Sequence, residues 1–127
     1  VVRALAPDVA VIHVQEADEA GNGIIRGPKF EDVLMTRAAR RVVLTAERIV
    51  GRSRTGMRPE AIDIPGFLVE AVVHAPRGAS PCSCAGMYEA DLKALEKFKK
   101  LDTGEIESFI RSYERADRSG RKAGAAI

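Results

Sequence analysis

Four side chains able to bind a metal ion or exchange protons lie within seven positions near the start of the sequence: His13, Glu16, Asp18 and Glu19. Imidazole and carboxylate groups are ordinary zinc ligands and ordinary acid–base partners. His13, however, lies inside the apolar run Val9–Val14, and the acids follow only where that run ends. A ligating histidine needs a second ligand on its own face of the strand, so the sequence predicts a hydrogen-bonded core histidine and no metal site here.

The segment after these acids, Gly21-Asn22-Gly23, has the composition of a tight turn, because glycine and asparagine both tolerate positive φ angles. It matches neither the G-x-G-x-x-G pattern nor the Walker pattern of phosphate-binding loops. Glu16, Asp18 and Glu19 lie where a strand leaves its sheet, and in open parallel sheets ligands bind beyond such carboxyl ends. The alternative is that they are solvated loop acids, with Asp18 holding the turn through bonds to its backbone.

Two other groups have structural interpretations. Cys82 and Cys84 are two residues apart, and on an extended chain such side chains point to opposite sides, so they are not expected to bond to each other. With no second cysteine pair they do not form a zinc motif either, which leaves packed or half-exposed thiols. A set of arginines could meet a phosphate, but a solvated face is the preferred interpretation: Arg48, Arg52, Arg54 and Arg58.

Three apolar runs predict strands that are buried on both faces, as in a parallel sheet: Val9–Val14, Arg41–Val50 and Leu68–Ala75. A helix opened by Pro28 is predicted between the first two strands. Its apolar stripe has helical spacing and comprises Phe30, Val33, Leu34 and Ala38. Strand, helix and strand in this order indicate a right-handed βαβ unit.

Two helices are predicted to follow the third strand. The apolar face of the first comprises Tyr88, Leu92, Leu95 and Phe98, and that of the second comprises Ile106, Phe109, Ile110 and Tyr113. Asp102 and Glu105 have the spacing of a capping box at the start of the second helix. The expected fold class is α/β, a mostly parallel sheet with flanking helices. We expect a single domain over residues 1–127, with a frayed tail at 118–127.

Composition excludes several classes of function. Hydrophobic residues make up 46% and charged residues 30% of the 127 residues, as in globular proteins. The net charge of +2 is too small, and its basic residues too evenly mixed with acidic ones, to indicate a nucleic-acid partner. No apolar run approaches the roughly 20 residues of a membrane span, and the first residues lack the features of a signal peptide. These observations predict a cytoplasmic protein with no membrane partner.

The order of short motifs along the chain resembles the alpha subunit of the family I CoA-transferases, which include the glutaconate and 3-oxoacid enzymes. The family pattern is a strand with a His and an Ala-Asp, then Gly-Asn, Glu-Arg-Ile-Val, Ile-Pro-Gly, a Pro-x-Gly-Ala loop, a Tyr and an Asp. The matching residues are His13, Ala17-Asp18, Gly21-Asn22, Glu47-Arg48-Ile49-Val50, Ile64-Pro65-Gly66, Pro76, Gly78-Ala79, Tyr88 and Asp91. The resemblance covers the second half of that subunit and implies part of a NagB/RpiA/CoA-transferase-like fold.

The resemblance implies an enzyme that moves CoA between an acyl-CoA and a carboxylic acid, with coenzyme A as substrate and no other cofactor. The nucleophilic glutamate of the family belongs to the beta subunit, so no catalytic residue is expected in this chain, which alone would be inactive. The implied partner is a CoA-transferase beta subunit in a hetero-oligomer. From the strand-end argument, the substrate-binding candidates are Gln15, Asp18 and Asn22.

Two alternatives remain open. One is the alpha subunit of a related CoA-thioester hydrolase that opens a carbon ring, because that reaction uses the same fold. The other is a non-catalytic interaction module derived from this fold. The sequence does not predict the acyl substrate, the oligomeric state or the role of the two cysteines. It also does not explain why the family's first half has no counterpart here.

Overall fold

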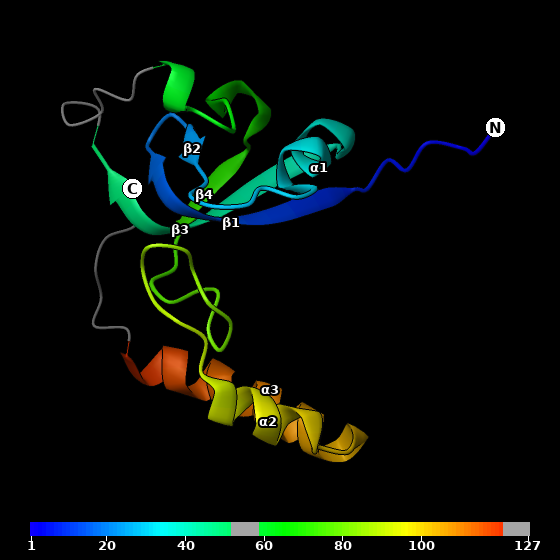
Figure 1. Cartoon of the computed structure of the whole chain (residues 1–127), viewed down its shortest axis with the longest axis vertical. Coiled ribbons are helices and arrows are strands. Elements are labelled where there is room, and N and C mark those ends of the chain that lie inside the picture. Colours follow the sequence, from blue (N-terminus) through cyan, green and yellow to red (C-terminus); the bar gives the residue numbers. More distant parts are fainter. Residues whose placement is uncertain (52–58, 121–127) are drawn as a thin grey trace. The chain divides into compact units, whose positions relative to one another are not determined.

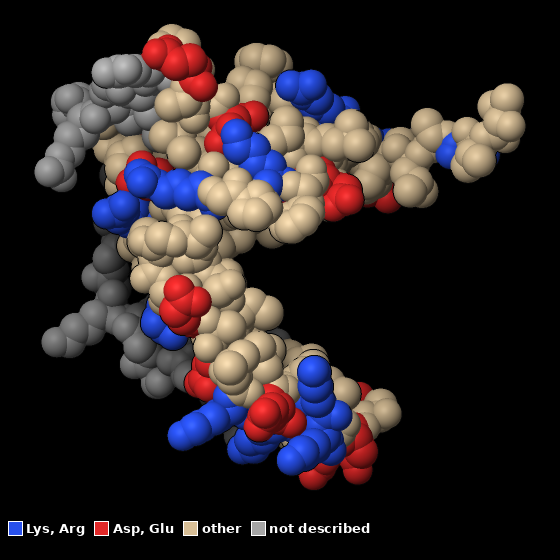
Figure 2. All heavy atoms as spheres, in the orientation of Figure 1, with Lys and Arg blue, Asp and Glu red and all other residues tan. Residues whose placement is uncertain are grey.

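The computed structural model describes residues 1–51 and 59–120, with side chains described in the last helix through residue 111. These residues fall into two compact units, Val1–Ala90 and Asp91–Ile127, which are treated separately below. On the face drawn in Figure 2, basic and acidic side chains are interspersed within each unit.

The first unit is built on a four-stranded sheet with the order β2-β1-β3-β4 (Figure 1). Its strands are β1 (Val9–Asp18), β2 (Gly23–Ile24), β3 (Arg41–Val50) and β4 (Ala71–His74). β1, β3 and β4 are parallel, and the short β2 pairs antiparallel with β1. The predicted α/β class with a mostly parallel sheet is confirmed, and β2 is an addition at a position where the sequence predicted only a turn.

The core lies on one face of this sheet. Alternate residues of β1 and β3 are buried there together with two isoleucines from the connections: Ala10, Ile12, Val14, Val42, Leu44, Ala46, Ile25 and Ile64. Val33 of helix α1 (Asp32–Ala38) and Val69 pack against this cluster. Because successive side chains of a strand point to opposite faces of the sheet, the other residues of β1 and β3 point away from the core.

The prediction that the strands are buried on both faces is wrong for the amino-terminal part of the sheet. Val9, Val11 and Val73 are between 45% and 61% exposed on the face opposite the core. Figure 1 shows α1 on one side of the sheet and the loop that follows β4 on the other. That loop bonds to Gln15 and Glu47 near the carboxyl ends of β1 and β3, whereas Val9 and Val11 at the start of β1 are exposed.

The helix α1 begins later than predicted, and its predicted apolar stripe is partly wrong. Phe30 has a φ of 39° and therefore cannot be part of a right-handed helix. Phe30 and Leu34 are 83% and 66% exposed, whereas Thr36 is buried and Val33 packs on the core. The Thr36 hydroxyl donates to the Val33 carbonyl at 2.8 Å, which satisfies the polar group and permits its burial.

The third predicted strand is shorter than expected. Its first residue, Leu68, ends a 3₁₀ turn, Gly66–Leu68, and only Ala71–His74 pair with β3. A second 3₁₀ turn, Pro59–Ala61, precedes it. The Ile64-Pro65-Gly66 motif therefore marks the entry to a turn that packs against the Gly21-Asn22-Gly23 turn, because Gly23 and Ile64 form an antiparallel bridge.

The second unit contains two helices, α2 (Leu92–Lys99) and α3 (Thr103–Gly120). The predicted capping box is confirmed: the Glu105 amide donates to the Asp102 carboxylate at 2.9 Å, and the Asp102 amide donates to the Glu105 carboxylate at 3.0 Å. The Phe98 and Phe109 rings lie 5.4 Å apart between centroids, so α2 and α3 make contact.

Other parts of the helix prediction differ from the structure. Tyr88 precedes α2, which begins after the Asp91 cap, so it does not belong to the face of that helix. Residues 118–120 of the predicted tail belong to α3, and residues 121–127 and the Tyr113 side chain lie outside what the structure describes. None of the helices in the described part of the chain is long and apolar enough to cross a membrane.

Candidate functional site at the carboxyl ends of β1 and β3

The Asp18 side chain organises the turn after β1. It accepts hydrogen bonds from the Ala20 amide at 2.9 Å, the Asn22 amide at 2.8 Å and the Asn22 side chain at 2.9 Å. The Asn22 side-chain oxygen accepts in turn from the Gly66 amide at 2.9 Å. The two motifs Gly21-Asn22-Gly23 and Ile64-Pro65-Gly66 are therefore held together by side-chain bonds that begin at a buried carboxylate.

Gln15 connects β1 to two later segments. Its side-chain nitrogen donates to the carbonyls of Arg26 and Ala85, each at 3.2 Å, and its oxygen accepts from the Arg26 amide at 2.9 Å. The three substrate-binding candidates, Gln15, Asp18 and Asn22, thus lie at the carboxyl end of β1 as expected, and each bonds within the chain. Contact with substrate by any of them stays a prediction.

Glu16 and Glu19, the other two acids near His13, are ion-paired or exposed. Glu16 forms ion pairs with Arg48 at 2.6 Å and with Arg26 at 3.3 Å. Glu19 is exposed at the turn. Of the four arginines considered above, Arg48 alone lies in the described part of the chain, and Arg52, Arg54 and Arg58 fall outside it.

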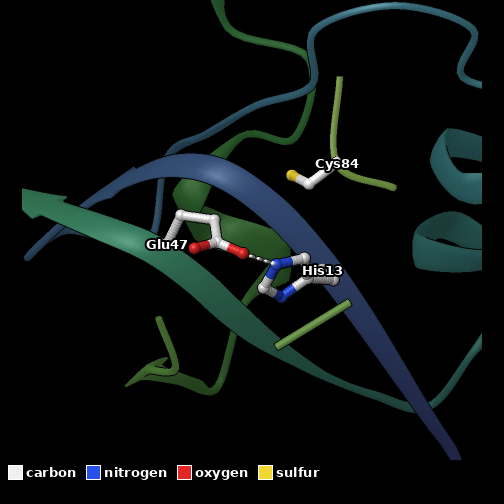
Figure 3. Close-up of side chains that lie close together, drawn as sticks. All are labelled: His13, Glu47 and Cys84. Carbon is white, nitrogen blue, oxygen red and sulfur yellow. Dashed lines mark hydrogen bonds and ion pairs between the residues drawn. The ribbon is translucent and has the colours of Figure 1, made fainter. Parts of the chain in front are cut away.

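A carboxylate that was not among the sequence-based candidates lies at the centre of the site. Glu47 is 5% exposed, and three segments donate hydrogen bonds to it. One oxygen accepts from His13 Nε2 at 2.9 Å and from the Tyr88 hydroxyl at 2.5 Å, and the other accepts from the Arg77 amide at 2.7 Å. We call Glu47 with these partners and the neighbouring Cys84 the Glu47 cluster; Figure 3 shows three of its side chains.

His13 is hydrogen-bonded, as predicted, but it is half-buried and its main partner is a distant residue. Nδ1 lies 2.9 Å from the Thr45 hydroxyl and Nε2 lies 2.9 Å from Glu47. In the parallel register His13 pairs with Thr45, so alternation brings Glu47 to the same face of the sheet. Pairing the two predicted strands by their apolar alternation would have been the signal for this contact.

The loop after β4 provides the remaining contacts of the Glu47 cluster. The Ala79 amide donates to the Tyr88 hydroxyl at 3.0 Å, and the Arg77 guanidinium lies 4.7 Å from the centre of the Tyr88 ring. Arg77 has a φ of 58°, a left-handed conformation that costs free energy in a non-glycine residue. The bond from its amide to Glu47 offsets part of that cost. Glu47 therefore holds both ends of the loop segment from Arg77 to Tyr88.

Burial and hydrogen bonding shift the pKa values of three side chains in the Glu47 cluster. Desolvation alone would raise the pKa of Glu47, but hydrogen bonds from Tyr88, the Arg77 amide and His13 outweigh it, and the pKa lies below its ordinary value. Burial and the bond to this carboxylate raise the pKa of Tyr88 to about 12. Burial, together with the Glu47 charge, also raises the pKa of the Cys84 thiol. Glu47 is thus an ionised acceptor with its donors in place rather than a free nucleophile.

This pKa shift predicts an acid-dependent loss of stability. A carboxyl whose pKa is lower in the folded state stabilises the fold above its unfolded pKa, and this contribution disappears as the pH falls through the folded value. We expect the free energy of unfolding to fall from about pH 5 downward, and to fall less steeply in a Glu47→Gln variant. Denaturant titrations of both proteins across this range measure the difference. Equal slopes would show that Glu47 has the same pKa in both states.

The two thiols are predicted to differ in reactivity. Both are free; Cys82 is exposed, whereas Cys84 is buried and its raised pKa keeps it protonated. We expect one thiol per chain to react rapidly with iodoacetamide near neutral pH and the second to react at least about tenfold more slowly. Peptide mass spectrometry identifies the alkylated positions. Equal labelling rates of the two cysteines in folded protein would contradict the burial of Cys84.

The fold and the hydrogen bonds at its strand ends define a mostly parallel α/β domain with ordered turns. Comparison with known proteins identifies the family to which this domain belongs. The family model described as Coenzyme A transferase matches residues 1–75. The chain belongs to the coenzyme A transferase family.

The relatives include named subunits of such enzymes. The chain is 42% identical over 94 residues to the A subunit of glutaconate CoA-transferase from Acidaminococcus fermentans, covering 74% of this chain and 29% of that protein. It is 36% identical over 116 residues to the A subunit of 3-oxoadipate CoA-transferase from Pseudomonas knackmussii, covering 87% and 40%. The crystal structure of the Acidaminococcus enzyme superposes with a TM-score of 0.77, 37% identity and coverage of 83% and 34%. The chain therefore spans well under half the length of these relatives.

Proteins with other named activities are also similar to this chain. The crystal structure of a variant of the decarboxylase AibA/AibB superposes with a TM-score of 0.74 and 36% identity, covering 88% of this chain and 40% of the other. The cholesterol ring-cleaving hydrolase IpdA subunit of Mycobacterium tuberculosis is 29% identical over 116 residues, covering 87% and 39%. Because these similar proteins are named for different reactions, membership of the family does not identify the reaction of the whole protein.

Proposed function

We propose that this chain forms part of the alpha subunit of a CoA-transferase, which moves CoA between an acyl-CoA and a carboxylic acid. The observation that supports this most is the 42% identity to the A subunit of glutaconate CoA-transferase, because it extends over 74% of the chain. The partner in this proposal is a beta subunit that contains the nucleophilic glutamate, in a cytoplasmic hetero-oligomer. The two transferase relatives are each named as one subunit of an enzyme, which supports the need for such a partner.

The reaction proceeds in two halves. The glutamate carboxylate attacks the thioester carbonyl and expels the CoA thiolate, which forms a mixed anhydride. The thiolate then attacks the glutamyl carbonyl, which releases the first carboxylic acid and leaves CoA bound to the enzyme as a thioester. The second carboxylic acid accepts CoA by the reverse of these steps. No redox cofactor is needed, because every step exchanges one acyl bond for another.

In this proposal the chain contributes the ordered edge of the shared site. Gln15, Asp18 and Asn22 lie at the carboxyl end of β1, where ligands approach parallel sheets. The loop fixed by Glu47 lies at the adjoining ends of β3 and β4. Both are held by internal hydrogen bonds, and such pre-organisation lowers the entropy lost when a substrate binds.

A related hydrolase is the second candidate, because the 29% identical IpdA subunit is named as a ring-cleaving hydrolase. Water would then be the second substrate in place of the carboxylic acid, and it would add across the carbon–carbon bond of the ring that breaks. A non-catalytic module of this fold is the third candidate. The identity to named enzyme subunits favours the enzymatic proposals over it.

The experiment is native mass spectrometry of the protein purified from its own source, with acyl-CoA and borohydride added to a parallel sample. We expect a complex with a second polypeptide, one glutamate of which is reduced with loss of activity. A complex that turns over acyl-CoA without this trapping would favour the hydrolase. A protein without a second polypeptide and without any response to acyl-CoA would contradict the enzymatic proposal.

A further inference from the structure

Three potential metal ligands of different chemical types meet within the Glu47 cluster. The ligating atoms of His13, Glu47 and Cys84 all lie within 4.8 Å of one another. They come from β1, from β3 and from the loop after β4, and Figure 3 shows the three side chains in the same region. Imidazole nitrogen, carboxylate oxygen and thiolate sulfur are the three ligand types that proteins use for zinc.

The present spacing requires only small movements to admit an ion. Tetrahedral zinc bonds of about 2.0–2.3 Å place ligand atoms about 3.3–3.8 Å apart. His13 Nε2 and Glu47 lie 2.9 Å apart, so they must separate by about half an ångström, and the thiol must approach by about 1.5 Å at most. His13 is half-buried, whereas Glu47 and Cys84 are 5% and 6% exposed.

Outer hydrogen bonds already orient two of the three ligands. Metal-bound histidines bond through their second ring nitrogen to a neighbouring group, which fixes the ring. His13 Nδ1 has this contact, 2.9 Å from the Thr45 hydroxyl. Glu47 keeps its bonds from Tyr88 and the Arg77 amide if an ion replaces the His13 proton, because a carboxylate has about four acceptor positions.

Charge and proton balance fit a divalent ion. With a carboxylate at Glu47, a thiol at Cys84 and an uncharged imidazole at His13, the three side chains together carry one negative charge. On binding, the thiol loses its proton to solvent, and the His13 proton moves from Nε2 to Nδ1, where the Thr45 oxygen accepts it. The ion then neutralises one carboxylate and one thiolate, which avoids a net buried charge.

We propose that His13, Glu47 and Cys84 form a binding site for a zinc-class divalent ion, with the fourth position open on the exposed side of His13. The mixed nitrogen, oxygen and sulfur ligands select zinc or cobalt over magnesium and calcium, which prefer oxygen alone. The proposal is independent of the proposed transferase function, because it concerns only ligands of this chain. It revises the expectation of no metal site, which considered only the acids that follow His13 in sequence.

The experiment is a titration of the reduced protein with Co²⁺, followed by the thiolate-to-cobalt charge-transfer absorption in the near ultraviolet. We expect one Co²⁺ per chain, its displacement by Zn²⁺, and an affinity that rises about tenfold per pH unit while one proton is released. Absence of the charge-transfer band in the folded protein would overturn the proposal.

Variants identify the ligands. Cys84→Ser is expected to abolish the band and to weaken Zn²⁺ binding at least about 100-fold, and His13→Gln to weaken it similarly. Cys82→Ser is the matched control and should bind like the unchanged protein, because Cys82 is exposed and outside the cluster. Circular dichroism checks that each variant is folded. A band that persists in Cys84→Ser, or that Cys82→Ser removes, would assign the binding to other groups and reject this site.

Discussion

Replacing Gly66 by alanine is expected to destabilise the protein by about 3 kcal/mol or more, the largest effect of a single methyl group added at any described glycine. A Cβ at this position would lie 2.0 Å from the Ala20 carbonyl oxygen and 3.2 Å from the Asn22 amide nitrogen. Both neighbours are backbone atoms, so no side chain can rotate away. The two turns must separate, which breaks the bond between the Gly66 amide and the Asn22 side chain.

Denaturant unfolding of the Gly66→Ala protein measures this effect. Gly51→Ala is the matched control, because an added Cβ at Gly51 meets no atom of the described residues within 4 Å, and its stability should stay within about 0.5 kcal/mol of the unchanged protein. If Gly66→Ala were as stable as this control, the close packing of the two turns would be incorrect.

Removal of the Glu47 carboxylate is the second large prediction. In Glu47→Ala three donors lose a buried acceptor: the Tyr88 hydroxyl, His13 Nε2 and the Arg77 amide. Each unsatisfied donor costs about 1–3 kcal/mol, so we expect a total loss of about 3 kcal/mol or more. The loop from Arg77 to Tyr88 should also lose protection, which amide hydrogen exchange detects as faster exchange at Arg77 and Ala79.

Two further variants make this prediction specific. Glu47→Gln should lose less, about 1–2 kcal/mol, because its amide oxygen can still accept from the Arg77 amide while Tyr88 and His13 can each present an acceptor to its nitrogen. Glu19→Ala is the control, since Glu19 is exposed at the turn. Equal stabilities of Glu47→Ala and Glu19→Ala would refute the role assigned to the buried carboxylate.

Features encoded by neighbouring residues were predictable from the sequence. The capping box needs only Asp102 and Glu105, three residues apart, and it forms as expected. The turn at Gly21-Asn22-Gly23 is held by Asp18, the bonding that the alternative interpretation described. The strand Arg41–Val50 has the predicted bounds because its apolar run has no competing turn signal.

Features that depend on distant contacts were not predictable in this way. Glu47 lies within a motif that the sequence presents as the end of a strand, and its role requires the register that places it beside His13. Tyr88 has the spacing of the predicted helix face, but its hydroxyl donates a hydrogen bond to Glu47 instead. That contact depends on a residue 41 positions earlier in the sequence. Phe30 and Leu34 fit an apolar stripe, but the observed entry to α1 turns them outward.

The proposal that this chain is part of a CoA-transferring enzyme can be tested by following the carboxylic acid that accepts CoA. The assembled enzyme that contains this chain is incubated with acyl-CoA and a set of isotope-labelled short carboxylic acids. We expect label from at least one acid to enter a CoA thioester while the total amount of thioester stays constant. Consumption of acyl-CoA with no label in thioester, whether free CoA is released or a ring-opened acyl-CoA forms, would contradict transfer and support hydrolysis.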